Sequence, residues 1–210
     1  LYLYPDKITD ELVAVIRDND RVCKYVDLPV QHVSDTVLAR MNRHGDGAVV
    51  RAAVEKIRRE IPGVTLRTTA IVGFPGETEE QFAELCEFVK ETGFDRFGAF
   101  TYSPEEGTPA AEFPDQIDEQ VKQDRYDTLM AVQLAVSEKK MQERLGDVVE
   151  VLCEGYDHVA GVQYGRSRAD APDVDGKVYF TSAKKLPEGV FVNVKITKAL
   201  DYDLFGEAVR

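Results

Sequence analysis

The sequence predicts an α/β domain of parallel strands joined by helices, followed by a small antiparallel β-barrel. Residues 1–145 alternate strand-like apolar runs with amphipathic helical patterns, an order typical of a parallel sheet with right-handed crossovers. Residues 146–210 change to period-two alternation in short runs between Gly and Asp turns, which favours antiparallel strands. We therefore place a domain boundary between residues 145 and 146.

Helices and one short strand are expected in the first third of the chain. A helix is predicted over residues 10–18, where Thr9 can cap the first turn. A short strand follows over residues 23–29, and Ser34 can cap a second helix. A third helix carries apolar residues on one face up to residue 61, where a Pro-Gly pair stops it.

Two further strands are expected over residues 64–74 and 94–102. Between them, Thr78 and Gln81 form a capping box, in which each side chain satisfies a backbone amide of the other residue. Gly93 is placed to end the helix that this box starts. A long helical pattern after the last strand closes this segment.

Residues suited to ligand binding follow all three predicted strands. The strands fit either a barrel or an open sheet, and in both folds ligands meet the carboxyl ends of the strands. The residues at these ends are polar or glycine-rich: Gln31 and His32, then Gly73 to Glu77, then Tyr102 and Ser103. A ligand site at this rim is therefore predicted.

Each of the main rim residues also has a structural alternative. Gly73 removes a Cβ at the end of a buried strand, which either lets a flat ligand approach or simply allows a tight turn. Gln31 and His32 can hydrogen-bond ribose hydroxyls or a carboxylate, although a single histidine is often structural. Arg67 would be a buried cation that needs a ligand carboxylate or a protein acid such as Asp27.

The densest polar cluster of the second segment runs from Gly165 to Gly176. It contains Arg166, Asp170 and Asp175, and its composition suits a recognition loop. The alternative is a turn-rich connection in which Asp and Gly serve turn geometry.

Charge and cysteine content limit the classes of function. The net charge of -12 argues against general nucleic-acid binding, which depends on Lys and Arg, and favours a basic partner or none. Cys23, Cys86 and Cys153 are 63 and 67 residues apart, so no zinc or iron–sulfur spacing is present. With no membrane-length apolar run and no N-terminal signal pattern, a cytoplasmic protein is expected.

Three long stretches resemble the radical S-adenosylmethionine (SAM) methylthiotransferases: DLPVQHVSDTVLARMNRHG, RTTAIVGFPGETEEQF and GAFTYSPEEGTPAA, in that order. The resemblance implies that residues 1–145 are the C-terminal half of a partial TIM-like radical SAM barrel with parallel strands. Residues 146–210 resemble the TRAM domain, a small OB-like barrel that ends these enzymes.

Details of the motifs resemble the RimO branch, which methylthiolates an aspartate on the twelfth protein of the small ribosomal subunit. Gln31-His32 stands where the tRNA-modifying branch has Gln-Ser, and Glu105-Glu106 stands where that branch favours Arg-Pro. Residues 147–210 hold 11 acidic and 8 basic residues, a net charge of -3, which suits a basic ribosomal protein better than tRNA. The alternatives are a tRNA methylthiotransferase of the same superfamily and a TRAM-containing module that binds a partner without catalysis.

The resemblance also implies a chemistry. In the family, one 4Fe–4S cluster cleaves SAM, and the resulting radical abstracts hydrogen from the β-carbon of the aspartate. A second 4Fe–4S cluster passes on sulfur from a donor, a second SAM provides the methyl group, and a reductant supplies electrons. The protein's task is orientation and the exclusion of side reactions.

Residue roles follow from the same resemblance. Candidates for binding the ribose, adenine and methionine carboxylate of SAM are Gln31, His32, Arg67, Ile71, Gly73, Tyr102 and Ser103. Candidates for binding the substrate are Arg166, Asp170 and Asp175, which match a run typical of the RimO branch.

The sequence departs from the family at the cluster ligands. The C-x-x-x-C-x-x-C motif and three further cysteines of the family's N-terminal domain are absent. We therefore expect a fragment of a longer protein, without catalytic or metal-binding residues of its own. Leu1 to Pro5 would form the tail of a strand already under way. Open strand edges of an incomplete barrel could also pair with a second copy.

The first prediction is that the 210-residue chain binds no iron and cleaves no SAM, because its three cysteines are too far apart to hold a cluster. Iron analysis after anaerobic reconstitution and desalting tests this expectation. Stoichiometric iron in the purified chain would contradict it.

Overall fold

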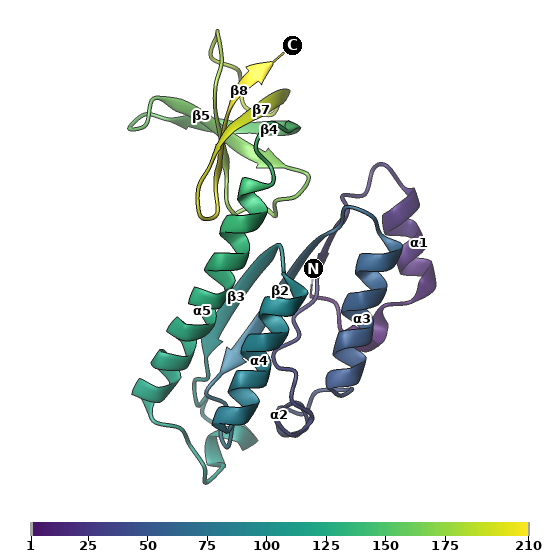
Figure 1. Ribbon diagram of the computed structural model, residues 1–210, viewed down its shortest axis with the longest axis vertical. Helices are drawn as coiled ribbons and strands as arrows, with labels where there is room; N and C mark the ends of the chain where they lie inside the picture. Colours follow the sequence, from purple (N-terminus) through teal and green to yellow (C-terminus); the bar gives the residue numbers. More distant parts are fainter. Residues whose placement is uncertain (1, 210) are drawn as a thin grey trace. The chain divides into compact units, whose positions relative to one another are not determined.

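The computed structural model describes residues 2–209 and is shown in Figure 1. The chain divides into two compact units, Leu1–Leu134 and Ala135–Arg210, and helix α5 (Glu119–Gln142) contributes to both. The boundary after residue 145 rests on the sequence pattern, and it stays a prediction.

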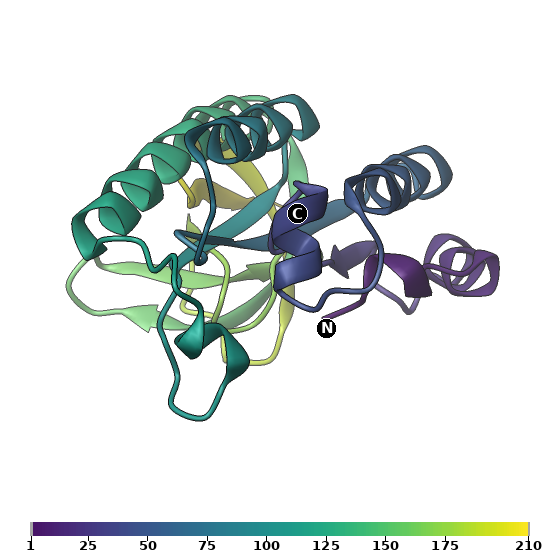
Figure 2. The same cartoon turned by 90° about the horizontal axis from the view of Figure 1, so that it is seen from below.

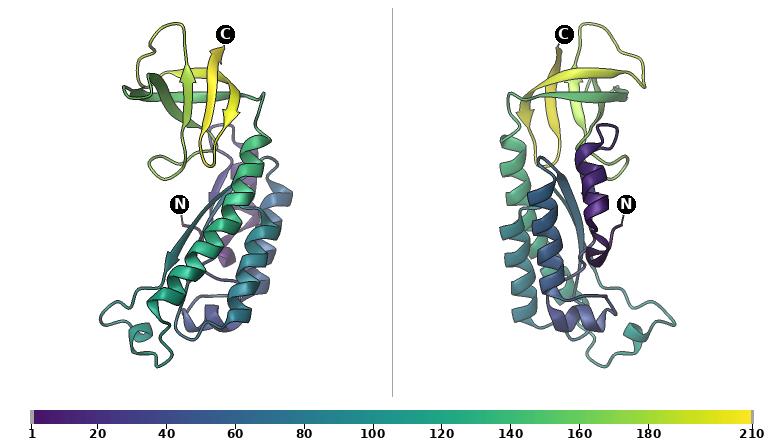
Figure 3. Two further views of the ribbon diagram at one scale, coloured as in Figure 1. Left: turned by 60° about the vertical axis from the view of Figure 1, so that its left-hand side comes forward. Right: turned by 90° about the vertical axis from the view of Figure 1, so that its right-hand side faces the viewer.

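The first unit is a three-stranded parallel sheet with helices between its strands, as the sequence predicts. The strands are ordered β1-β2-β3, and β2 pairs in parallel with both neighbours. Helices α3, α4 and α5 lie along one face of the sheet (Figures 2 and 3). The elements before α5 are η1 (Pro5–Lys7), α1 (Asp10–Asp18), β1 (Tyr25–Asp27), α2 (Asp35–Arg40), α3 (Gly47–Glu60), β2 (Thr65–Val72), α4 (Glu79–Thr92), β3 (Arg96–Thr101) and η2 (Pro109–Glu112).

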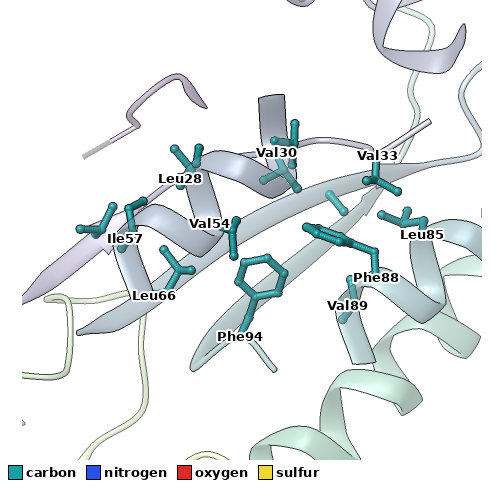
Figure 4. Close-up of a cluster of buried hydrophobic side chains, with 14 of the residues drawn as sticks. Leu28, Val30, Val33, Val54, Ile57, Leu66, Leu85, Phe88, Val89 and Phe94 are labelled. Carbon is teal, nitrogen blue, oxygen red and sulfur yellow. The ribbon is translucent and has the colours of Figure 1, made fainter. Parts of the chain in front are cut away.

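The core of this unit lies between the sheet and the helices. Alternate residues of β2, among them Leu66, Ala70 and Val72, are fully buried in it because side chains of a strand point to opposite faces in turn. Leu66 and Phe94 both belong to this core (Figure 4), and the rings of Phe94 and Phe88 meet edge to face at 5.7 Å. The remaining side chains of β2 therefore point to the opposite face of the sheet.

Local capping signals set the helix ends. The Thr9 hydroxyl accepts from the Leu12 amide, and both bonds of the predicted capping box at Thr78 are present. Gly93 ends α4 in the left-handed conformation, with φ 59°. Ser34 occupies the N-cap position of α2, but its hydroxyl makes no capping bond, so this part of the prediction was wrong.

The start of the chain is only partly described. Leu1 lies outside the described residues, so the expected strand tail can be compared only from residue 2 onward. Residues 2–4 have no strand assignment, yet the Leu3 amide donates to the Asp27 carbonyl at 3.0 Å. This stretch therefore lies beside β1 with a single backbone bond.

The second unit is a closed barrel ordered β4-β5-β6-β8-β7. Four of its neighbouring pairs are antiparallel, as the sequence predicts, and β6–β8 is parallel. Met141 of α5 belongs to the buried core of the barrel with Phe180 and Ile196. The strands are β4 (Val148–Asp157), β5 (Val162–Ser167), β6 (Val178–Thr181), β7 (Phe191–Ala199) and β8 (Leu204–Val209).

Across residues 2–209, no helix combines the length and the apolar character that crossing a membrane requires.

Gly73, which follows β2, gives a stability prediction. Its φ is 72°, and a Cβ added there would lie 2.3 Å from Cγ of Lys122, a residue of α5 that is only 2% exposed. Gly63, after α3, has a similar φ of 74° with nothing within 4 Å of an added Cβ. The two glycines therefore share backbone strain but not packing.

We expect Gly63→Ala to cost roughly 1–2 kcal/mol from the left-handed conformation. Gly73→Ala should cost that amount plus about 1–3 kcal/mol for overpacking against Lys122. Urea unfolding of both variants measures the difference. Equal losses of unfolding free energy in the two variants would mean that Lys122 can move away from the added methyl group without cost.

Candidate functional site

A cavity of about 690 Å³ opens on the face of the sheet opposite the buried core and helices α3, α4 and α5. Its floor is formed by Arg67, Thr69 and Ile71, which alternate with the core residues of β2, and by Phe100 of β3. Residues at the carboxyl ends of the strands and in the loops beyond them complete the wall. The cavity thus lies where the sequence predicts a ligand site.

Five of the seven residues predicted to bind SAM line this cavity. Gln31, Arg67, Ile71, Tyr102 and Ser103 are part of its wall. The other two, His32 and Gly73, are buried and do not line the cavity.

Gln31 is held at the cavity in a strained conformation. Its φ is 66°, which costs a non-glycine residue on the order of 1 kcal/mol. Its amide donates to the Thr69 carbonyl at 2.9 Å, and its carbonyl accepts from the Ile71 amide at 2.8 Å. The side-chain Oε1 is buried and has no partner among the described residues. Strain and an unsatisfied acceptor together are typical of a ligand contact.

Arg67 is paired within the protein. Its guanidinium donates to Asp27 Oδ2 at 2.9 Å, and the Asp27 side chain is 1% exposed. Of the two partners that the sequence left open, the structure shows the protein acid. The pair joins β1 to β2 at the floor of the cavity.

His32 and Gly73 meet at one buried carboxylate. Nδ1 of His32 accepts from the Ser34 amide at 3.0 Å, so the ring hydrogen lies on Nε2, which donates to Glu77 Oε1 at 3.0 Å. The Gly73 amide donates to Glu77 Oε2 at 2.6 Å. The two residues therefore support the cavity wall from behind.

Tyr102 packs into the rim. Its amide donates to the Val72 carbonyl at 2.9 Å, and its ring meets that of Phe74 edge to face at 5.0 Å. Burial raises the pKa of the Tyr102 phenol, so the hydroxyl keeps its proton near neutral pH. The residue offers an aromatic edge and a protonated hydroxyl.

Arg43 is a cavity residue that the sequence argument missed. It donates to the Pro29 carbonyl at 2.7 Å and lies 4.5 Å from the centre of the Tyr4 ring. No carboxylate pairs with it among the described residues. It follows Asn42, whose φ of 55° ends α2, and the Arg43 amide donates to the Leu38 carbonyl at 2.9 Å. This capping geometry does not tell from the sequence where the side chain points, so only the folded chain places it at the cavity.

The loop after β3 is fastened over the same cavity. Arg40 pairs with Asp115 at 2.9 Å, and its guanidinium lies 5.1 Å from the centre of the Phe113 ring. The Asp115 carbonyl accepts from the Gly76 amide at 2.9 Å. These contacts tie the loop to α2 and to the turn after β2.

The candidate substrate residues belong to the second unit. Arg166 of β5 pairs with Glu154 of β4. Oδ2 of Asp170 accepts from the amide and hydroxyl of Ser167, and Oδ2 of Asp175 accepts from the Ala171 amide. Both aspartates thus shape the loop between β5 and β6, which agrees with the turn-forming alternative and leaves substrate binding a prediction.

The cysteines lie in unlike surroundings. Cys23 is exposed, whereas Cys153 is buried and its sulfur accepts from the Gln163 side chain. Burial, with added effects of Glu77 and Glu87, raises the pKa of the Cys86 thiol to about 11. Within residues 2–209, no three His, Cys, Asp or Glu side chains gather as a metal site would require, and the iron prediction remains to be tested.

Comparison with known proteins agrees with the two-unit structure. The radical SAM superfamily matches residues 3–89, and the TRAM domain matches residues 145–209. The chain is 51% identical over 208 residues to the "Ribosomal protein uS12 methylthiotransferase RimO" of Alkaliphilus oremlandii, which covers 99% of this chain and 48% of that protein. The protein of the same name from Geotalea uraniireducens is 53% identical over 210 residues, which covers 100% of this chain and 47% of the relative.

A solved structure shares the fold of part of the chain. Coproporphyrinogen III oxidase (HemN) from Escherichia coli, a radical SAM enzyme, matches with a TM-score of 0.54 and 24% identity. The match covers 64% of this chain and 31% of that chain. The chain spans about half the length of the curated relatives that it matches. The chain therefore carries a radical SAM segment followed by a TRAM domain, and over nearly its whole length it is similar to methylthiotransferases named RimO.

Proposed function

We propose that this chain forms the SAM-binding wall and the substrate-recognition domain of an enzyme that methylthiolates an aspartate of ribosomal protein uS12. The observation that carries the proposal is the cavity at the carboxyl ends of the strands, lined by Gln31, Ile71 and Tyr102. The names of the relatives support the choice of uS12 as the substrate.

The cavity residues fit the parts of SAM. Gln31 Oε1 has no hydrogen-bond partner among the described residues and is suited to accept from a ribose hydroxyl. Arg43, without a carboxylate partner among residues 2–209, is suited to the methionine carboxylate. Ile71 and Tyr102 offer apolar and aromatic surface to adenine, and Ser103 borders it. When bound, SAM supplies hydrogen-atom abstraction and the methyl group.

The residues of this chain bind and orient. Because Arg67 pairs with Asp27, we assign Arg67 to the cavity floor. Arg43 is then the residue that we assign to bind the methionine carboxylate of SAM. His32 and Gly73 act through Glu77 and not by contact with the ligand. The two 4Fe–4S clusters, the sulfur donor and the reductant of the family belong to the whole enzyme, which would work in the cytoplasm.

The acidity of the second unit supports a basic protein as the partner. The net charge of -3 over residues 147–210 opposes binding of a polyanion and favours a Lys- and Arg-rich surface. A tRNA substrate and a binding module without catalysis are the alternatives.

Binding of S-adenosylhomocysteine, an unreactive probe with the same nucleoside and carboxylate, tests the SAM site. In the complete gene product, we expect Gln31→Gly to weaken affinity about tenfold, because a hydrogen bond of about 1.4 kcal/mol is lost while the φ is kept. Arg43→Met should weaken it by roughly tenfold or more through the lost charge-assisted bond. Asp173→Gly is the matched control, because Asp173 is another left-handed residue, with φ 62°, and lies in the second unit. This substitution should leave the affinity for S-adenosylhomocysteine unchanged.

Isothermal titration measures these affinities, with circular dichroism to confirm folding. Failure of the unaltered protein to bind the probe would refute the proposed SAM site. Affinities of both cavity variants equal to that of the unaltered protein would refute the residue assignment.

The substrate is tested separately. We expect the complete gene product to bind isolated uS12 more tightly than tRNA at the same ionic strength, and added salt should weaken the uS12 complex because opposite charges meet. Filter binding and co-sedimentation compare the two ligands. Tighter binding of tRNA would favour the alternative branch.

A further inference from the structure

Helix α5 contacts the wall of the cavity from behind through a buried cluster of charged groups. Arg125 Nη1 donates to Glu77 Oε2 at 2.8 Å and to the Glu77 carbonyl at 3.1 Å, and Nη2 pairs with Glu79. The Arg125 and Glu77 side chains are 7% and 0% exposed. A buried carboxylate needs such partners, because leaving it without them would carry a large desolvation cost.

The Glu77 carboxylate joins three segments of the chain. It accepts from His32, which follows β1, from the Gly73 amide after β2, and from Arg125 of α5. All three partners are hydrogen-bond donors. A side-chain amide in place of the carboxylate would therefore turn its own N–H groups toward one of these donors. We call this set, Glu77 with His32, Gly73 and Arg125, the Glu77 clasp.

Each segment that the clasp joins leads directly to a cavity residue. His32 follows Gln31, and Gly73 is followed by Phe74, which lines the cavity. One turn before Arg125, the buried Lys122 packs its stem against Gly73, and its Nζ lies 5.3 Å from the centre of the Tyr102 ring. The clasp is therefore continuous with the residues that face the ligand.

We propose that Arg125 is a positioning residue for the SAM site, which acts through Glu77 to hold Gln31 and the Gly73 turn in place. Arg125 lies on α5, beyond residues 3–89 that match the radical SAM superfamily. The inference rests on the proposed function, since it takes the ligand to be SAM. The inference adds that α5, which lies outside the segment matching the radical SAM superfamily, holds Gln31 and the Gly73 turn in place at the ligand site.

The unit contains a matched control. Arg58 of α3 pairs with Asp95 at 2.7 Å and donates to the Gly93 carbonyl at 2.8 Å. It is likewise an arginine that joins a helix to a carboxylate and a backbone carbonyl. It does not line the cavity, and Asp95 accepts from the amide of Leu66, in the first half of β2.

The experiment compares Arg125→Met, Arg125→Lys, Glu77→Gln and Arg58→Met in the complete gene product. S-adenosylhomocysteine affinity is measured at a temperature where each variant is folded, and the unfolding midpoint is recorded beside it. We expect all variants to lower the midpoint. Only changes in the clasp should weaken the affinity, by at least tenfold for Arg125→Met and Glu77→Gln, and by less for Arg125→Lys, which keeps the charge.

A double-mutant comparison separates positioning from general stability. If Arg125 acts through Gln31, the affinity loss of Gln31→Gly with Arg125→Lys should be smaller than the product of the single losses. Folded Arg125 variants that bind as tightly as the unaltered protein would overturn the inference and leave the proposed function intact. The same loss in Arg58→Met as in Arg125→Met would overturn it too. An unaltered protein that does not bind the probe would overturn both.

Discussion

The architecture of the site depends on one buried carboxylate, that of Glu77. A charge with no solvent must be fully hydrogen-bonded, and the three donors that meet this need come from segments far apart in the sequence. This requirement explains why the turn after β2 points the Gly73 amide inward. It also explains why a histidine at position 32 is buried instead of facing the cavity.

Side chains of β2 point alternately to the core and to the cavity. Leu66, Ala70 and Val72 belong to the core, whereas Arg67 and Ile71 lie on the cavity side. A shift of register by one residue would exchange these sets and bury the arginine among apolar side chains. The Asp27–Arg67 pair gives the register an ionic contact at the first two strands.

The sequence predicted what local chemistry decides. The capping box at Thr78 and the left-handed Gly93 depend on neighbours within one helix, and both were confirmed. Hydrogen bonds between residues distant in the sequence could not be predicted in this way. Arg125 is 48 residues from Glu77, and no local sequence pattern indicates that the two residues pair. For the same reason Arg67 had two open partners, and Arg43 was missed. The parallel pairing of β6 with β8 depends on how the barrel closes, which no single strand encodes.

Closure of the barrel constrains how the second unit can recognise a protein. Every strand from β4 to β8 has two neighbours, so none is the edge strand of an open sheet. An extended segment of another protein cannot join it as an additional strand, the mode in which main-chain bonds supply affinity whatever the sequence of the guest. Selectivity of the second unit for any protein partner must then come from side chains and loops, so it can be altered by exchanging surface residues while the barrel is kept.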